Sequence, residues 1–254
     1  MDIEITRDGL KLRGRVEKAL GEKTPALIIF HGFGGDSGYG EGNIYDLLAN
    51  KARACGVTAV RFDFSGYGRS QGCFEDMDVL REILDAIAIL QYVQSLPDIT
   101  DIYLLGHSQG GVVAGMLAGL YPDVVKKLIL LAPAATLKTD AQKGTCMGTV
   151  YDPRHIPNEI LVDGQHHVGG HYFRIAKHLP IYEITSGYTG GTLLIHGIWD
   201  TVVDYHASIE YHRCMPNSRL SLYEELDHGI DGKDKEKVLE EIGRFIGSND
   251  RKNC

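Results

Sequence analysis

The chain has 254 residues, of which 43% are hydrophobic and 24% are charged, and its formal net charge is −8 at pH 7. This composition suits one globular domain with an insertion, and the acidic balance argues against nucleic acid or an anionic membrane surface as a partner. No apolar stretch is long enough to span a bilayer and residues 1–10 show no secretory signal, so we expect a cytoplasmic protein without a membrane contact.

The predicted elements begin with a hairpin and continue as an alternation of strands and helices. Alternating apolar residues flank the turn signal "DG" at 8–9, which predicts two antiparallel strands. The continuous apolar runs after it, typical of buried parallel strands, lie at 26–30, 57–62, 101–105, 128–132, 192–196 and 220–224. Helical spacing predicts helices over 76–93 and near 238–246. We therefore expect an α/β fold, a mostly parallel central sheet with helices on both faces.

The segment from about 134 to 187 breaks this alternation. It is rich in polar residues, glycine and histidine, and it is longer than a crossover between two strands requires. It follows the carboxyl end of a predicted strand, where open α/β sheets bind their ligands. We predict a core made of 1–133 and 188–254 and an inserted lid subdomain, 134–187. The alternative is an insertion that has no role in the function.

The stretch "GHSQGG" (106–111) lies between a predicted strand and the apolar, helix-like segment that follows it. Glycine and serine are ordinary turn residues, and a lone G-x-S-x-G also occurs by chance. The strand, tight turn and helix around it are, however, the context of a nucleophile elbow, in which small neighbours allow a strained serine to stand above the sheet. Ser108 is therefore a candidate nucleophile.

A serine nucleophile needs a base and an orienting acid. His228 follows the last predicted strand, and Asp200 follows the strand before it. Asp204 competes for the acid role, but Asp200 lies closer to its strand end. Asp227 is a weaker candidate, because adjacent loop residues point apart.

An early loop, "FHGFGG" (30–35), follows another predicted strand, and its glycines allow backbone amides to turn inward. The amides of Phe33 and Gln109 are the candidate donors of an oxyanion hole. His31 and His107 flank these two segments. Either could touch a substrate, although such histidines are more often packed and hydrogen-bonded to backbone.

Several other patterns resemble metal, phosphate or nucleophile sites but are too weak to predict one. His167 and His171 have metal-ligand spacing, but the glycines between them argue against a helix and no third ligand is spaced nearby. The Gly-rich stretch 34–42 lacks the lysine of a phosphate-binding loop. No feature of the sequence around Cys73 or Cys146 indicates a nucleophile. The scattered, odd-numbered cysteines indicate free thiols in a reducing compartment: Cys55, Cys73, Cys146, Cys214 and Cys254.

The chain resembles the α/β-hydrolase superfamily over nearly its full length, and more narrowly the bacterial feruloyl (cinnamoyl) esterases. The widely shared segments are "HGFGG" (31–35) and "DIYLLGHSQGGVVA" (101–114). The more specific ones are "HIPNEI" (155–160) and "GGHYFRIAKHLPIYE" (169–183) in the insertion. The remaining shared segments are "RFDFSGYGRSQG" (61–72), "LLIHGIWDTVV" (193–203) and "DH" (227–228).

This resemblance implies an α/β-hydrolase fold with a small lid and a serine esterase that cleaves small-molecule esters of hydroxycinnamic acids. It implies that Asp140 and Tyr172 face the aromatic acyl group. Met147 and Trp199 stand where relatives have polar or small residues, and they would make the pocket more apolar. No metal or organic cofactor is expected, and a homodimer is compatible with this interpretation.

Three alternatives remain open at this point. A broad short-chain carboxylesterase needs the same triad. A lipid-type esterase or thioesterase needs it too, but its lid should expose more Leu, Ile and Phe than this polar segment does. A non-catalytic binding protein on the same fold has no need of every triad member.

Overall fold

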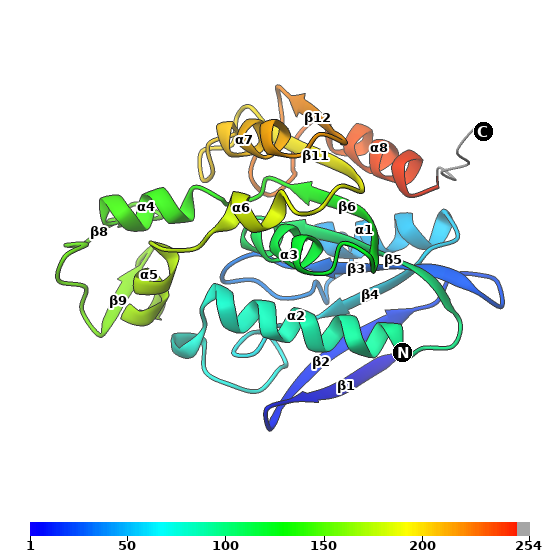
Figure 1. Ribbon diagram of the computed structural model, residues 1–254, viewed down its shortest axis with the longest axis horizontal. Coiled ribbons are helices and arrows are strands. Elements are labelled where there is room, and N and C mark those ends of the chain that lie inside the picture. The colour runs from blue at the N-terminus through cyan, green and yellow to red at the C-terminus, as the bar shows by residue number, and fades with distance from the viewer. Residues whose placement is uncertain (248–254) are drawn as a thin grey trace.

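The computed structural model describes residues 1–247, so Cys254 lies outside the described residues. An eight-stranded sheet runs through the molecule in the order β1-β2-β4-β3-β5-β6-β11-β12 (Figure 1). The first three strands in this order pair antiparallel and all the others pair parallel. The strands are β1 (Asp2–Arg7), β2 (Leu10–Glu17), β3 (Thr24–Phe30), β4 (Thr58–Phe62), β5 (Ile99–His107), β6 (Val125–Leu131), β11 (Gly191–Gly197) and β12 (Ser218–Tyr223).

The predicted hairpin and mostly parallel sheet are confirmed. Asp8 and Gly9 both have positive φ, 49° and 83°, which is the conformation of the tightest hairpin turns. Each predicted apolar run overlaps one of the six strands that follow the hairpin in this sheet. The central strands β3, β4, β5 and β6 are almost wholly buried, as continuous apolar runs require.

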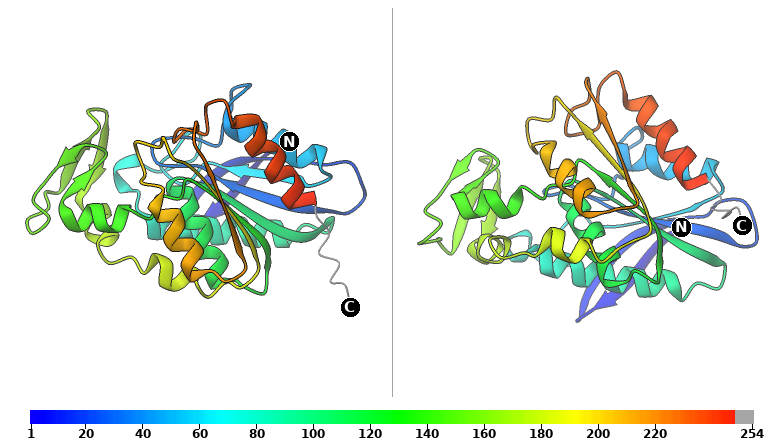
Figure 2. Two further views of the ribbon diagram at one scale, coloured as in Figure 1. Left: turned by 90° about the horizontal axis from the view of Figure 1, so that it is seen from above. Right: turned by 45° about the horizontal axis from the view of Figure 1, so that its top comes forward.

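Helices cover both faces of the sheet (Figure 2). On one face lie α1 (Ile44–Ala54) and α8 (Lys235–Gly247), and on the other lie α2 (Val79–Gln94), α3 (Gln109–Leu120) and α7 (His206–Cys214). The helices expected near 76–93 and 238–246 are confirmed. The helix α1 was not predicted from the sequence, although Asn43 caps it and accepts a hydrogen bond from the Tyr45 amide.

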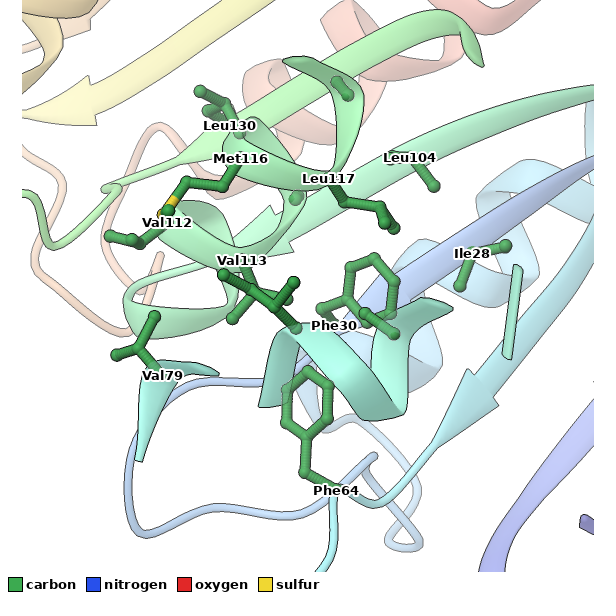
Figure 3. Packing of buried hydrophobic residues seen from close by; sticks show 14 of the residues in the cluster. Ile28, Phe30, Phe64, Val79, Leu104, Val112, Val113, Met116, Leu117 and Leu130 are labelled. Carbon is green, nitrogen blue, oxygen red and sulfur yellow. The ribbon is translucent and has the colours of Figure 1, made fainter. Parts of the chain in front are cut away.

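The helix after "GHSQ" is apolar on every side and lies in the core. Its residues from Gln109 to Ala118 are all buried, which is typical of a central helix. Figure 3 shows Val113 beside the ring of Phe30, which stacks on Phe64 at a centroid distance of 5.6 Å. Each fully buried side chain of this size contributes about 1.5–3 kcal/mol. This packing fixes the N-terminus of α3 above the carboxyl end of β5.

The chain between β6 and β11 forms a series of short elements whose buried side chains join the core. In Figure 1, α4, β8, β9 and α5 project beyond one end of the sheet, whereas α6 packs against α3. The elements are α4 (Leu137–Lys143), β7 (Thr145–Cys146), β8 (Thr149–Val150), β9 (Glu159–Val162), β10 (His166–Gly169), α5 (Gly170–Ala176) and α6 (Ile181–Thr185). A short 3-10 helix of the core, η1 (Phe74–Asp76), contacts β10. Within residues 1–247, no helix combines the length and apolar character needed to cross a bilayer.

Candidate active site

Ser108 occupies a strained turn between β5 and α3. Its φ of 55° and ψ of −124° are rare for a residue with a side chain. The turn is so tight that a Cβ at position 106 would lie 2.1 Å from the Gly110 carbonyl oxygen. A Cβ at position 110 would lie 2.3 Å from the His31 carbonyl oxygen. Only glycine fits at either position, and the strand, turn and helix predicted around "GHSQGG" are confirmed.

Three side chains from distant parts of the chain align at this turn. The Ser108 Oγ lies 2.9 Å from His228 Nε2, and His228 Nδ1 lies 2.7 Å from Asp200 Oδ2. The other carboxylate oxygen of Asp200 accepts hydrogen bonds from the Val202 and Val203 amides, each at 2.8 Å. Burial raises the pKa of Asp200, but the hydrogen bonds from His196 and His228 outweigh it and hold the pKa well below its ordinary value. Asp200 is therefore a carboxylate that can orient the imidazole.

The two competing acids, Asp204 and Asp227, have partners other than His228. Asp204 is exposed, and its Oδ1 lies 2.7 Å from the ring of its neighbour His206. Asp227 accepts a hydrogen bond from the Asp231 amide at 2.8 Å within its own loop. The geometry thus brings Asp200, rather than either of these, to His228.

His196 is a member of this site that the sequence analysis missed. Its Nε2 lies 3.1 Å from both Asp200 Oδ2 and the Val203 carbonyl oxygen. A carbonyl only accepts, so Nε2 carries the proton and Nδ1 faces the Ser208 hydroxyl at 2.8 Å. His196 is fully buried and stands four residues before Asp200 at the end of β11. That spacing, "HGIWD", was the available signal.

Two free backbone amides flank Ser108. Gln109 is the first residue of α3, so its amide has no partner inside the helix. Phe33 follows β3 in a loop so close to the serine that a Cβ on Gly32 would lie 2.9 Å from the Ser108 Cβ. Phe33, Ser108 and Gln109 line the same cavity. In the described chain neither amide donates to a protein acceptor, so both are available to an oxyanion.

His31 does not reach the cavity lining. Its ring is buried between Phe64 and Tyr67, with Nδ1 2.9 Å from the Gly32 carbonyl and Nε2 accepting from the Phe64 amide at 3.1 Å. Burial lowers the pKa of this imidazole, so it stays neutral and donates through Nδ1. His31 is therefore a packed histidine that is hydrogen-bonded to backbone, and it stabilises the loop that carries Phe33.

His107 is also turned away from the cavity, and it links three loops of the site. Its Nε2 donates to the His228 carbonyl at 2.7 Å, and its Nδ1 accepts from the Tyr45 hydroxyl at 2.9 Å. Burial, reinforced by the nearby His228, lowers the pKa of His107 to about 4 and keeps it neutral. Tyr45, which the sequence analysis missed, in turn accepts from the Gly32 amide at 3.0 Å.

A cavity of about 560 Å³, including its open mouth, begins at Ser108 and extends under the insertion. Its polar groups include Asp140, whose pKa is raised by burial. The cavity is lined by Phe33, Ser108, Gln109, Ala134, Thr136, Leu137, Asp140, Ala141, Thr145, Cys146, Met147, Tyr172, Phe173, Val202 and Val203.

Of the four substrate contacts that the resemblance implies, three line the cavity and one does not. Asp140, Met147 and Tyr172 line the cavity, and the Tyr172 hydroxyl donates to the Gln109 side chain at 2.8 Å. Trp199 does not line it and is 59% exposed. A side chain beside the acid in sequence is thus directed outward, because the loop after β11 turns Asp200 inward.

The remaining candidates have other partners. His167 and His171 fall on different elements, β10 and α5; His167 pairs with Glu159 and His171 contacts the Asp76 carbonyl. Residues 1–247 hold no group of three or more His, Cys, Asp or Glu placed to bind a metal ion. Cys73 is exposed, and burial raises the pKa of the Cys146 thiol to about 12.

A comparison with protein families matches residues 25–150 to the model described as alpha/beta hydrolase fold. Among solved structures, Est1E from Butyrivibrio proteoclasticus, solved with ferulic acid bound, superposes with a TM-score of 0.91. It shares 32% sequence identity with this chain, and the match covers 96% of this chain and 97% of that one. Alpha/beta hydrolase domain-containing protein 10 from mouse shares the fold, with a TM-score of 0.77 and 21% identity over 97% of this chain and 98% of that one.

Curated relatives match over part of their length. Mouse monoglyceride lipase is 29% identical over 55% of this chain and 47% of its own length. The human palmitoyl-protein thioesterase ABHD10 is 25% identical over 76% of this chain and 62% of its own length. With the sheet order, the elbow and the match to Est1E, these comparisons show that the chain belongs to the α/β-hydrolase family and resembles the bacterial feruloyl esterases.

Proposed function

We propose that this protein is a serine esterase that hydrolyses carboxylic esters through an acyl-enzyme, with esters of hydroxycinnamic acids as its substrates. The observation that carries the proposal is the hydrogen-bonded series Ser108–His228–Asp200, in which Ser108 lines the cavity. A nucleophile, a base and an orienting acid at these distances have the geometry of a working triad.

In the proposed reaction, Ser108 Oγ attacks the ester carbonyl while His228 Nε2 takes its proton. Asp200 holds the imidazole in the tautomer whose Nδ1 donates, and its negative charge stabilises the imidazolium. The Phe33 and Gln109 amides donate to the oxyanion; one such donor contributes about 10²–10³ in rate. His228 then gives its proton to the leaving alcohol, and water, deprotonated by the same imidazole, releases the carboxylic acid.

The cavity supports an aromatic acyl group. Phe33, Tyr172 and Phe173 provide rings along its wall, and Asp140 provides a half-buried carboxyl. An aromatic acid with a phenolic hydroxyl fits both features, because the ring packs on the apolar wall and the hydroxyl donates to the carboxyl. The structural match to Est1E with ferulic acid bound supports the same class of ligand.

A lipid-type esterase or thioesterase is the second candidate, favoured by the names of the curated relatives. Its lid should present a wide apolar surface. The exposed large apolar side chains of the insertion are limited, in the described chain, to Met147, Val150 and Leu161. This small number favours the hydroxycinnamate proposal.

The test combines a covalent probe with a substrate panel. A fluorophosphonate probe should label Ser108 in the wild type and leave Ser108→Ala unlabelled; absence of labelling would support a non-catalytic binding protein. Values of kcat/KM for methyl ferulate, a long-chain acyl ester, a palmitoyl thioester and an acetyl ester then separate the esterase classes. The proposal requires the highest value for methyl ferulate.

A further inference from the structure

A buried carboxyl lies beside the candidate oxyanion donor. Glu82, on the inward face of α2, is 2% exposed, and it has no ion-pair partner in the described chain. Such a group is costly to bury unless hydrogen bonds compensate it. Here the Gln109 Nε2 atom lies 2.8 Å from one carboxyl oxygen of Glu82 and 2.9 Å from the other.

Gln109 connects this carboxyl to the insertion. Its side-chain oxygen accepts the Tyr172 hydroxyl at 2.8 Å, and Tyr172 belongs to α5 and lines the cavity. A chain of hydrogen bonds therefore runs from the insertion, through the first residue of α3, to α2. The middle member is the residue whose backbone amide faces the oxyanion in the proposed reaction.

This chain has two possible directions, which differ in whether the nitrogen or the oxygen of the Gln109 side-chain amide faces Glu82. When Glu82 is ionised, both its oxygens accept, so the Gln109 amide donates to them and its oxygen takes the Tyr172 proton. Tyr172 can then only accept from a ligand. When Glu82 is protonated, it donates to the Gln109 oxygen, the amide turns by half a rotation and donates to Tyr172, and the Tyr172 proton is free for a ligand.

We propose that Glu82 is a positioning residue that orients the Gln109 amide and so decides whether the Tyr172 hydroxyl donates inward or toward the acyl group. This inference rests on the proposed function and deepens it. In the ionised state, Tyr172 favours an acyl group that carries a phenolic O–H. In the protonated state, it also serves an acyl group whose ring oxygen is methylated and can only accept.

The groups around Glu82 allow both states near neutral pH. Burial raises the pKa of Glu82 to about 8, against the effect of the Gln109 hydrogen bond. On its own helix, the negative charges of Asp78 and Asp85 act in the same direction as burial. From other elements it interacts with Tyr172 and with Tyr67. The buried Tyr67 hydroxyl faces Glu82 and Gln109 outside strict hydrogen-bond geometry, and like Gln109 it lowers the pKa of Glu82.

Two esters that differ by one methyl group test the proposal. We expect the ratio of kcat/KM for methyl 4-hydroxycinnamate to that for methyl 4-methoxycinnamate to rise about fivefold between pH 6 and pH 8. One hydrogen bond is worth about a factor of ten, and a pKa of about 8 leaves half of Glu82 ionised at pH 8. In Glu82→Gln the ratio should not change over this range. Glu236→Gln, at an exposed position of α8, is the matched control and should keep the wild-type profile. An equal change with pH in the wild type and Glu82→Gln would overturn the proposal.

A second measurement needs no substrate and separates this inference from the proposed function. The side-chain amide NMR signals of Gln109, assigned by their loss in Gln109→Leu, should shift between pH 6 and pH 9 in the wild type and stay fixed in Glu82→Gln. Titrating signals together with no turnover of any cinnamoyl ester would refute the proposed substrate and leave the role of Glu82 intact. Signals that do not titrate would refute the role of Glu82, whatever the substrate.

Discussion

The candidate triad and the cavity beside it depend on different parts of the fold. Ser108, Asp200 and His228 each follow one of three parallel strands, β5, β11 and β12, so the sheet determines where they meet. The cavity wall comes mainly from the insertion, including α4, β7 and α5, and Tyr172 of α5 reaches back to Gln109 of α3. Changes at the strand ends should therefore affect the chemistry, whereas changes in the insertion should affect the choice of substrate.

The largest expected effect is that of Ser108→Ala. Removing the nucleophile should lower kcat by about 10⁶ while the fold and ligand binding persist, because Ser108 adds nothing to the core beyond its Cβ. Turnover of methyl ferulate, with circular dichroism and ligand binding as controls, measures this. Residual activity within tenfold of the wild type would mean that another group attacks the ester.

Asp200→Asn should come next, with a loss in kcat of about 10⁴. An amide cannot hold the Nδ1–H tautomer of His228 as the carboxylate does. Asp204→Asn is the matched control, because it changes an acid on the same loop whose partner is His206. Equal losses in the two variants would move the acid role away from Asp200.

The difference between the two regions also explains what the sequence could reveal. Strand ends and the "GHSQGG" turn depend on local patterns, and the elbow, the sheet and the positions of Asp200 and His228 were predicted from them. Glu82 and Gln109 are 27 residues apart and Tyr45 and His107 are 62 apart, so no local pattern shows that they touch. Trp199 shows a different error: the resemblance placed it at the pocket, but in the loop after β11 it is exposed and does not line the cavity.

Glu82 offers a way to separate stability from chemistry. Its folded-state pKa of about 8 lies above the ordinary value of 4.5. The folded protein thus keeps a proton that the unfolded chain releases, and this contribution to stability is complete below about pH 4.5 and lost as the pH rises through 8. Between pH 5 and pH 8 the free energy of unfolding should fall by on the order of 3 kcal/mol more in the wild type than in Glu82→Gln. Urea unfolding at several pH values measures it; parallel curves would show that Glu82 ionises normally.

The smallest expected effects distinguish two residues of the cavity. Asp140→Asn removes a carboxylate acceptor that has no role in the triad. It should reduce the preference for methyl ferulate over methyl cinnamate by about 1–3 kcal/mol and barely change turnover of an acetyl ester. Tyr172→Phe should behave differently, because it also leaves the Gln109 side-chain oxygen without its donor next to the candidate oxyanion amide. We therefore expect Tyr172→Phe to lower kcat/KM for all three esters. If Asp140→Asn instead lowered all three equally, Asp140 would hold the insertion in place and would not recognise the acid.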